Sequence, residues 1–172
     1  MYLITRSIEI DMGHRIPTHG SKCASLHGHR YKIIAGAYSE RLVSNGVETG
    51  MVMDFGRLKQ AMMENIHDVF DHAFAWHIHD PALDKMHIES MLSVTLKMLR
   101  DPRSSLGNIS HIAPIVNPDA LPGPPQRMVF MRNIPTAENL ASAWFGALAY
   151  RVPTLKYVEV HETPNCMARY EP

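Results

Sequence analysis

The sequence has few cysteines, no long apolar run and no excess of either charge. Its two cysteines, Cys23 and Cys166, are too few for a disulfide framework, and a reducing compartment would keep both as thiols. No stretch approaches the roughly 18 apolar residues that a membrane-spanning helix requires. Lysine plus arginine and aspartate plus glutamate each total 17. We therefore expect no nucleic-acid or membrane partner, and a small molecule as the substrate or ligand.

The first residues also lack the features of a secretory signal. They read MYLITRSIEIDMGH, with no basic stretch before a long apolar run and no small-residue cleavage site. We expect no signal peptide and a cytoplasmic location. The 172 residues, 45% apolar and 20% charged, suit a single globular domain over 1–172. Histidine is unusually frequent for a chain of this length, with 11 copies.

The periodicity of apolar residues predicts an α+β domain. Alternation predicts strands, and apolar residues at helical spacing predict helices. The predicted strands are 2–12, 27–40, 128–131, 155–161 and 167–170. The predicted helices are 55–69, with Asp54 as N-cap, and a second that opens at 135–138 with Thr136 as N-cap and ends near 150. We expect the first two strands to pair antiparallel through the long loop between them.

The segment between the two helices is an insertion over about 81–127. Residues 82–100 have a helical composition, whereas 101–127 are rich in proline and predict a long surface loop. The element order is strand, strand, helix, insertion, helix, strand, strand.

The sharpest motif is His27-Gly28-His29, at the start of a predicted strand. Residues i and i+2 of a strand point to the same face, so both imidazoles can reach one ion, and Gly28 leaves room on the other face. His14 ends the preceding strand and would lie beside them in an antiparallel pair. Three neutral imidazoles with an open fourth position are typical of catalytic zinc. The alternative is that these are ordinary surface or core histidines.

Cys23 precedes His27 by four residues. It could be a fourth metal ligand, or a base, because a thiol beside a cation is readily deprotonated. It could equally be an inert, half-buried cysteine, the commoner role of a lone cysteine.

Three acidic positions are candidates for chemistry or binding. Asp71 directly precedes His72, and a carboxylate that orients a histidine makes it a proton carrier; the alternative is a histidine at a helix C-terminus. Glu162 follows the last long strand and could bind an amidine-like edge through paired hydrogen bonds, or simply face solvent. Glu138, near the start of a helix, is favoured there by the helix dipole whatever its function.

These motifs appear in the order found in the 6-pyruvoyltetrahydropterin synthase family, and the sequence resembles that family over nearly its whole length except about 81–127. The motifs are His14, Cys23-x-x-x-His27-Gly28-His29, Asp71-His72, Pro135-Thr136-Ala137-Glu138-Asn139-Leu140-Ala141 and Val160-His161-Glu162-Thr163. The resemblance implies zinc at His14, His27 and His29, proton transfer by Cys23, Asp71 and His72, pterin binding by Glu162, and a pocket that Thr136 and Glu138 line or support.

The gap of three residues between Cys23 and His27 is similar to that of the bacterial 6-carboxytetrahydropterin synthases of the queuosine route. This implies conversion of 7,8-dihydroneopterin triphosphate to 6-carboxytetrahydropterin with release of acetaldehyde and triphosphate. The pyruvoyl-forming reaction, cleavage of sepiapterin and a non-catalytic zinc-containing pterin binder remain alternatives.

The resemblance also implies a fold and an assembly. The expected fold is the tunnelling fold, with antiparallel strand pairs and two helices in ββααββ order. Such domains form trimeric barrels that stack in pairs, with active sites between subunits, so we expect a homo-oligomer, either a trimer or a hexamer.

Overall fold

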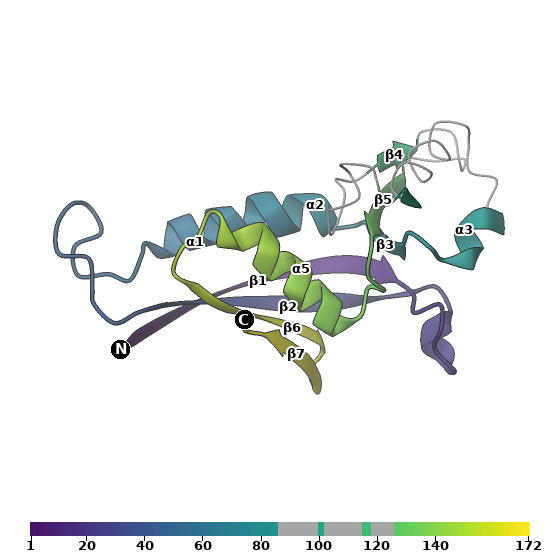
Figure 1. The fold of residues 1–172 in the computed structure, drawn as a ribbon, viewed down its shortest axis with the longest axis horizontal. Coiled ribbons are helices and arrows are strands. Elements are labelled where there is room, and N and C mark those ends of the chain that lie inside the picture. The colour runs from purple at the N-terminus through teal and green to yellow at the C-terminus, as the bar shows by residue number, and fades with distance from the viewer. Residues whose placement is uncertain (86–99, 102–114, 118–125) are drawn as a thin grey trace. The chain divides into compact units, whose positions relative to one another are not determined.

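The protein is described here by a computed structural model, which places residues 1–85, 100–101, 115–117 and 126–172 (Figure 1). Within these residues the strands form one sheet in the order β4-β5-β3-β1-β2-β6-β7. The strands are β1 (Tyr2–His14), β2 (His27–Ser39), β3 (Phe74–His77), β4 (Ile115–Asn117), β5 (Gln126–Met131), β6 (Leu155–Thr163) and β7 (Cys166–Tyr170). The helices are a 3-10 turn η1 (Lys22–Ala24), α1 (Phe55–Met62), a π-helical segment η2 (Met63–His67), α2 (Asp68–Phe70), α3 (Pro81–Lys85) and α5 (Ala137–Ala149).

The chain forms two compact units. The first comprises Met1–Asp11, His29–Asp71 and Ala137–Pro172, and the second comprises Met12–Gly28 and His72–Thr136. Strands β1 and β2 each continue from one unit into the other without a break.

The first unit is a sheet of β1, β2, β6 and β7 with helices α1, α2 and α5 over one face (Figure 1). Strand β6 pairs antiparallel with β2, with Lys32 opposite His161, and with β7 on its other side. In the central parts of β1 and β2, alternate residues are buried, because strand side chains alternate between faces. The buried positions include Ile8, Ile10, Tyr31, Ile33, Val158 and Val160.

The helix predicted over 55–69 forms, but it is not uniformly α-helical. Asp54 caps it as expected, since its Oδ1 accepts hydrogen bonds from the backbone N–H groups of Gly56 (2.8 Å) and Arg57 (3.0 Å). Residues Met63–His67 then adopt a π-helical turn before the last α-helical residues. Such π-helical turns are often found at functional sites.

The second unit contains strands that the periodicity did not predict. β3 pairs parallel with both β1 and β5, and β4 pairs antiparallel with β5. The segment 101–127, expected to be one loop, therefore holds β4 and the start of β5, where β-branched residues such as Ile115 and Val116 favour a strand. The core of this unit comprises Trp76, Ile78, Leu83, Met128 and Phe130.

The strands and helices predicted outside the insertion are present, with ends that differ by a few residues. The predicted helical character of 82–100 holds for the first residues, within α3, whereas 86–99 lie outside the described residues. Among the described helices, none has the length and apolarity needed to cross a membrane.

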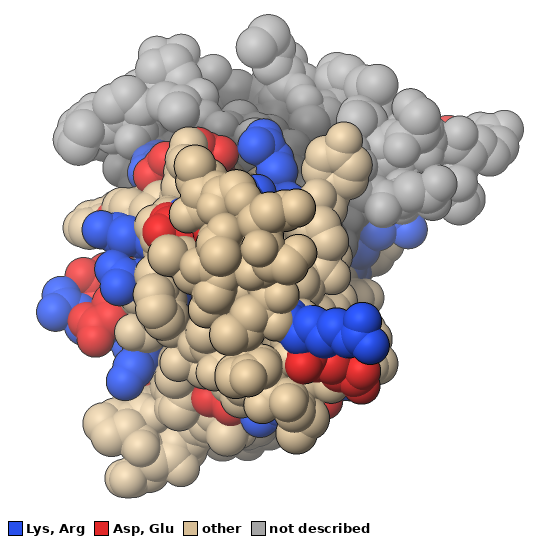
Figure 2. All heavy atoms as spheres, turned by 90° about the vertical axis from the view of Figure 1, so that its left-hand side faces the viewer, with Lys and Arg blue, Asp and Glu red and all other residues tan. Residues whose placement is uncertain are grey.

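The described surface seen in Figure 2 carries positive and negative side chains close together rather than in patches of one sign. Ion pairs among the described residues include Arg57 with Glu48 (2.9 Å) and Arg30 with Asp11 (2.8 Å). This agrees with the equal numbers of basic and acidic residues in the sequence.

Candidate metal centre and active site

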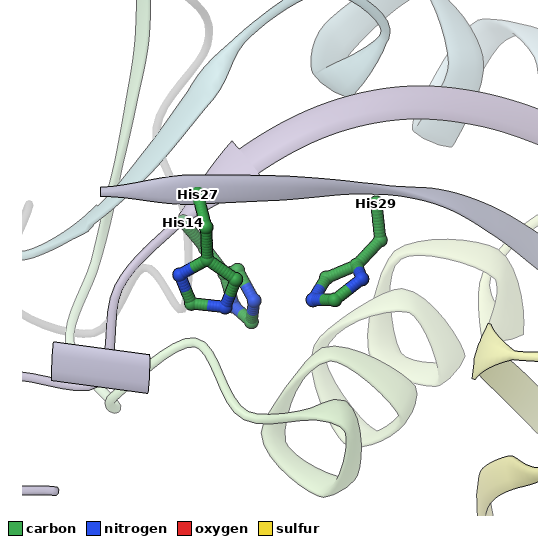
Figure 3. A group of neighbouring side chains, drawn as sticks. All are labelled: His14, His27 and His29. Atoms are coloured by element: carbon green, nitrogen blue, oxygen red, sulfur yellow. The ribbon is translucent and has the colours of Figure 1, made fainter. Parts of the chain in front are cut away.

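His14, His27 and His29 converge where β1 ends and β2 begins (Figure 3). One ligand atom from each lies within 4.8 Å of the others, and the ring centroids of His14 and His27 are 4.6 Å apart. His14 lies on the same buried face of β1 as Met12, two residues earlier, and is 2% exposed. The convergence predicted from strand alternation is therefore present.

Backbone carbonyl groups set the orientation of two of the rings. His14 Nδ1 lies 2.7 Å from the carbonyl oxygen of Pro135, and His27 Nδ1 lies 2.8 Å from that of Ser25. A carbonyl oxygen can only accept, so in each neutral ring Nδ1 carries the proton and Nε2 keeps its lone pair. This arrangement, a ring nitrogen held by a main-chain oxygen, is typical of metal-binding histidines.

The donor set fits a zinc ion. Three neutral imidazoles are the ligand type of catalytic zinc sites, which keep one position open for water or substrate. The group of potential ligands found among the described residues contains the three histidines and not Cys23. The geometry thus provides a possible metal site, and the chemistry of its donors favours zinc.

Two glycines allow β1, β2 and β3 to approach closely beside this group. A Cβ atom on Gly28 would lie 3.0 Å from the carbonyl oxygen of Met12, and one on Gly13 would lie 2.5 Å from the ring of Phe74. A larger residue at position 28 would displace the backbone of β1, and one at position 13 would displace the ring of Phe74. The space that Gly28 was expected to leave is occupied by the backbone of β1 at Met12 and Gly13.

Glu162 lies near the third histidine. Its Oε1 is 3.8 Å from His29 Nε2 and accepts a hydrogen bond of 3.1 Å from the hydroxyl of Tyr31. Tyr31 is fully buried, and burial, followed by the neighbouring carboxylate, raises its pKa well above the ordinary value for tyrosine. The sequence did not point to Tyr31, because its contact with Glu162 depends on the register between β2 and β6.

Cys23 lies in the 3-10 turn η1 and is half-buried with a free thiol. Its carbonyl oxygen accepts a hydrogen bond of 2.9 Å from the backbone N–H of Ile16, two residues after His14. This bond closes the loop between β1 and β2 at its base. The loop is thus held to the end of the strand that carries the first histidine.

Asp71 and His72 follow α2. Asp71 Oδ1 accepts a hydrogen bond of 2.9 Å from the backbone N–H of Asp11, and its Oδ2 lies 3.9 Å from His67 Nε2, one helical turn earlier. His72 has φ 55°, in the left-handed region that non-glycine residues rarely adopt, and it is exposed. Strained backbone of this kind is concentrated at functional sites. Asp11 and His67 contact Asp71, and neither contact was predicted from the sequence.

The two other predicted pocket residues lie at the start of α5. Thr136 immediately precedes the helix and is half-buried, and its backbone N–H donates to the carbonyl oxygen of Ile134 (2.7 Å). Glu138 is in the first turn and exposed, where a carboxylate suits the helix dipole. Their role in a pocket remains a prediction.

Arg15, next to His14, forms an ion pair that the sequence did not suggest. Its Nε lies 3.2 Å from Oδ2 of Asp80, which is fully buried. Asp80 Oδ1 also accepts from the backbone N–H of Ala82 (2.8 Å). A buried carboxylate requires such partners, so the pair fixes the backbone just after the histidine.

Comparison with known proteins agrees with this geometry. The family model described as 6-pyruvoyl tetrahydropterin synthase matches residues 3–172. The chain is 31% identical to the 6-carboxy-5,6,7,8-tetrahydropterin synthase of Rickettsia conorii, over 96% of this chain and 97% of that protein.

Solved structures show the same fold. An uncharacterized protein from Wolinella succinogenes superposes with a TM-score of 0.70 at 24% identity, covering 99% of this chain and 97% of its own. The 6-pyruvoyl tetrahydropterin synthase of Caenorhabditis elegans gives 0.58 at 18% identity, with 99% and 95% covered. These likenesses confirm the predicted α+β tunnelling fold.

Proposed function

This chain belongs to the 6-pyruvoyl tetrahydropterin synthase family, and from that membership we propose that it is a zinc-dependent lyase of the 6-carboxytetrahydropterin type. The proposed reaction converts 7,8-dihydroneopterin triphosphate and water to 6-carboxy-5,6,7,8-tetrahydropterin, acetaldehyde and triphosphate. Two findings support this choice of product. The named relative is a 6-carboxy-5,6,7,8-tetrahydropterin synthase, and three residues separate Cys23 from His27.

The observation that carries the proposal is the convergence of three oriented imidazoles. His14, His27 and His29 would hold the zinc ion, and the rings of His14 and His27 are already fixed by main-chain carbonyl groups. A bound zinc ion would supply a Lewis acid that lowers the pKa of the substrate's side-chain hydroxyls.

Proton transfer is assigned to Cys23, Asp71 and His72. In this proposal the Cys23 thiolate removes a proton from the substrate side chain next to the ring, and His72 supplies one. Asp71 would orient the His72 ring and stabilise its charged form. The anchoring of Asp71 by the Asp11 N–H supports a fixed position for this carboxylate.

Pterin binding is assigned to Glu162, with Thr136 and Glu138 lining or supporting the pocket. An ionised carboxylate can accept two parallel hydrogen bonds from N3–H and the 2-amino group of a pterin. The short distance between Glu162 and His29 supports a pterin whose side chain reaches the histidine group.

We also propose a domain organisation, an oligomeric state and a cellular location for this protein. We propose that residues 1–172 form a single domain with an insertion at about 81–127, active as a homo-oligomer, a trimer or a hexamer of two trimers, in the cytoplasm as part of the queuosine route. If the active site requires more than one subunit, dilution to monomers will abolish turnover.

The direct test is to incubate the purified protein with 7,8-dihydroneopterin triphosphate and to measure acetaldehyde, with zinc quantified in the same sample. Stoichiometric acetaldehyde and 6-carboxytetrahydropterin support the proposal. A pyruvoyl product without acetaldehyde would assign the chain to the other reaction of the family. Pterin binding without any conversion would identify a non-catalytic binder.

A further inference from the structure

We propose that Tyr31 is a positioning residue for Glu162, whose buried phenol holds the carboxylate where it meets the paired N–H donors of a pterin ring. This inference rests on the proposed function, because it concerns how the same site places its substrate. Tyr31 does not contact the reacting atoms in this proposal, and its effect passes through Glu162.

The strand register places the two residues opposite each other. Lys32 of β2 pairs with His161 of β6. Because the strands are antiparallel, the residue before Lys32, Tyr31, lies opposite the residue after His161, Glu162. Their side chains project to the same face, as cross-strand partners do. The Tyr31 hydroxyl donates to Glu162 Oε1 at 3.1 Å.

The donor is rigid and the acceptor is not. Tyr31 is 0% exposed, and its ring stands edge-to-face against Trp144 of α5, with centroids 6.3 Å apart, and against His29, with centroids 5.6 Å apart. Glu162 has a flexible side chain that is 26% exposed. A hydrogen bond from this fixed hydroxyl therefore restricts the rotamers of the Glu162 side chain.

Tyr31 also fixes the distance between the pterin anchor and the histidine group. It is two residues after His29 on β2 and on the same face, and His29 Nε2 lies 3.8 Å from the oxygen that Tyr31 holds. Holding the carboxylate relative to His29 holds the pterin ring relative to the atoms that react.

The test replaces Tyr31 by phenylalanine, which removes only the hydroxyl. We expect Tyr31→Phe to raise KM for 7,8-dihydroneopterin triphosphate about tenfold, the effect of one hydrogen bond to a charged group, while kcat changes by less than about twofold. Zinc content should stay at the wild-type value. The matched control is Tyr38→Phe, which removes another phenol-to-glutamate hydrogen bond on β2, that to exposed Glu40 (3.3 Å), and should leave KM unchanged.

A double variant shows whether Tyr31 acts through Glu162. In the Glu162→Gln background, Tyr31→Phe should raise KM by much less than tenfold, because the charged acceptor is already gone. The same tenfold rise in both backgrounds would overturn the inference. So would wild-type KM in Tyr31→Phe, or a loss of zinc and of thermal stability that lowers kcat along with binding.

Equilibrium binding of neopterin, followed by fluorescence, separates this inference from the proposed reaction. If the wild-type protein binds neopterin about tenfold more tightly than Tyr31→Phe but converts no substrate, the positioning role stands and the reaction is wrong. If the wild-type protein turns over and both proteins bind neopterin equally, the reaction stands and the positioning role is wrong. If neither binds neopterin, the assignment of Glu162 fails and this inference fails with it.

Discussion

The histidine group and the Asp71–His72 pair differ in the kind of backbone that holds them. The three histidines lie at the ends of long strands, and two of the rings are fixed by main-chain carbonyl groups. Asp71 and His72 lie in a turn after a π-helical segment, and His72 has a left-handed backbone. The difference indicates a separation of tasks: regular strands hold the candidate metal ligands, and irregular chain presents the candidate proton carrier. Variants should therefore separate metal binding from turnover.

The largest effect is expected from removing a histidine of the group. His27→Ala leaves two imidazoles, and we expect zinc content to fall below about a tenth per chain with loss of measurable turnover, since a lost ligand costs more than the roughly 10–100-fold lost with an outer partner. Metal analysis after dialysis checks this. His19→Ala, at an exposed histidine in the loop that precedes β2, should retain zinc. If His27→Ala keeps its full zinc content, the three histidines are not the metal site.

Replacing the Cys23 thiol should lower turnover without loss of zinc. We expect Cys23→Ala to keep wild-type zinc and to lower kcat about 10³-fold, within the range of a general acid or base. Zinc content and acetaldehyde release are measured on one preparation. Cys166→Ala, at the exposed second cysteine, should be fully active. Loss of zinc in Cys23→Ala would show that the thiol is a fourth ligand, and full activity would show that it is inert.

A smaller loss of turnover is expected from replacing the carboxylate of Asp71. Asp71→Asn keeps an oxygen that can accept from the Asp11 N–H, so the fold and the zinc should be retained while kcat falls about 10²-fold. Steady-state rates over a range of pH test this. Asp68→Asn is the matched control, because Asp68 is 63% exposed and contacts the same histidine, His67. Equal losses in both variants would contradict a specific role for Asp71.

The smallest of these effects concerns the spacing of the strands. A methyl group on Gly28 meets the Met12 carbonyl oxygen at 3.0 Å, so Gly28→Ala should lower the free energy of unfolding by about 1–3 kcal/mol and weaken zinc binding. Chemical denaturation and a zinc titration measure both. Gly20→Ala, whose added carbon has nothing within 4 Å, should leave zinc affinity unchanged. An unaffected Gly28→Ala would show that the strands can separate without cost to the site.

Sequence periodicity predicted the histidine group because strand alternation is a local property. His27 and His29 share a face by spacing alone, and His14 needed only one antiparallel pairing. Tyr31 was missed because its partner depends on a register between strands about 130 residues apart, which no local pattern contains. Strand β3 was missed because its four residues show no alternation and pair with strands in parallel on both sides.

Because His72 has a left-handed backbone, stability and the proposed activity favour different residues at this position. A side chain other than glycine in this conformation costs about 1 kcal/mol, which glycine would not incur. His72→Gly should therefore unfold at a higher temperature while losing the imidazole to which proton transfer is assigned in the proposed reaction. A screen that selected this protein for heat resistance alone would favour glycine at position 72, and under the proposed mechanism the selected variants would be stable but inactive.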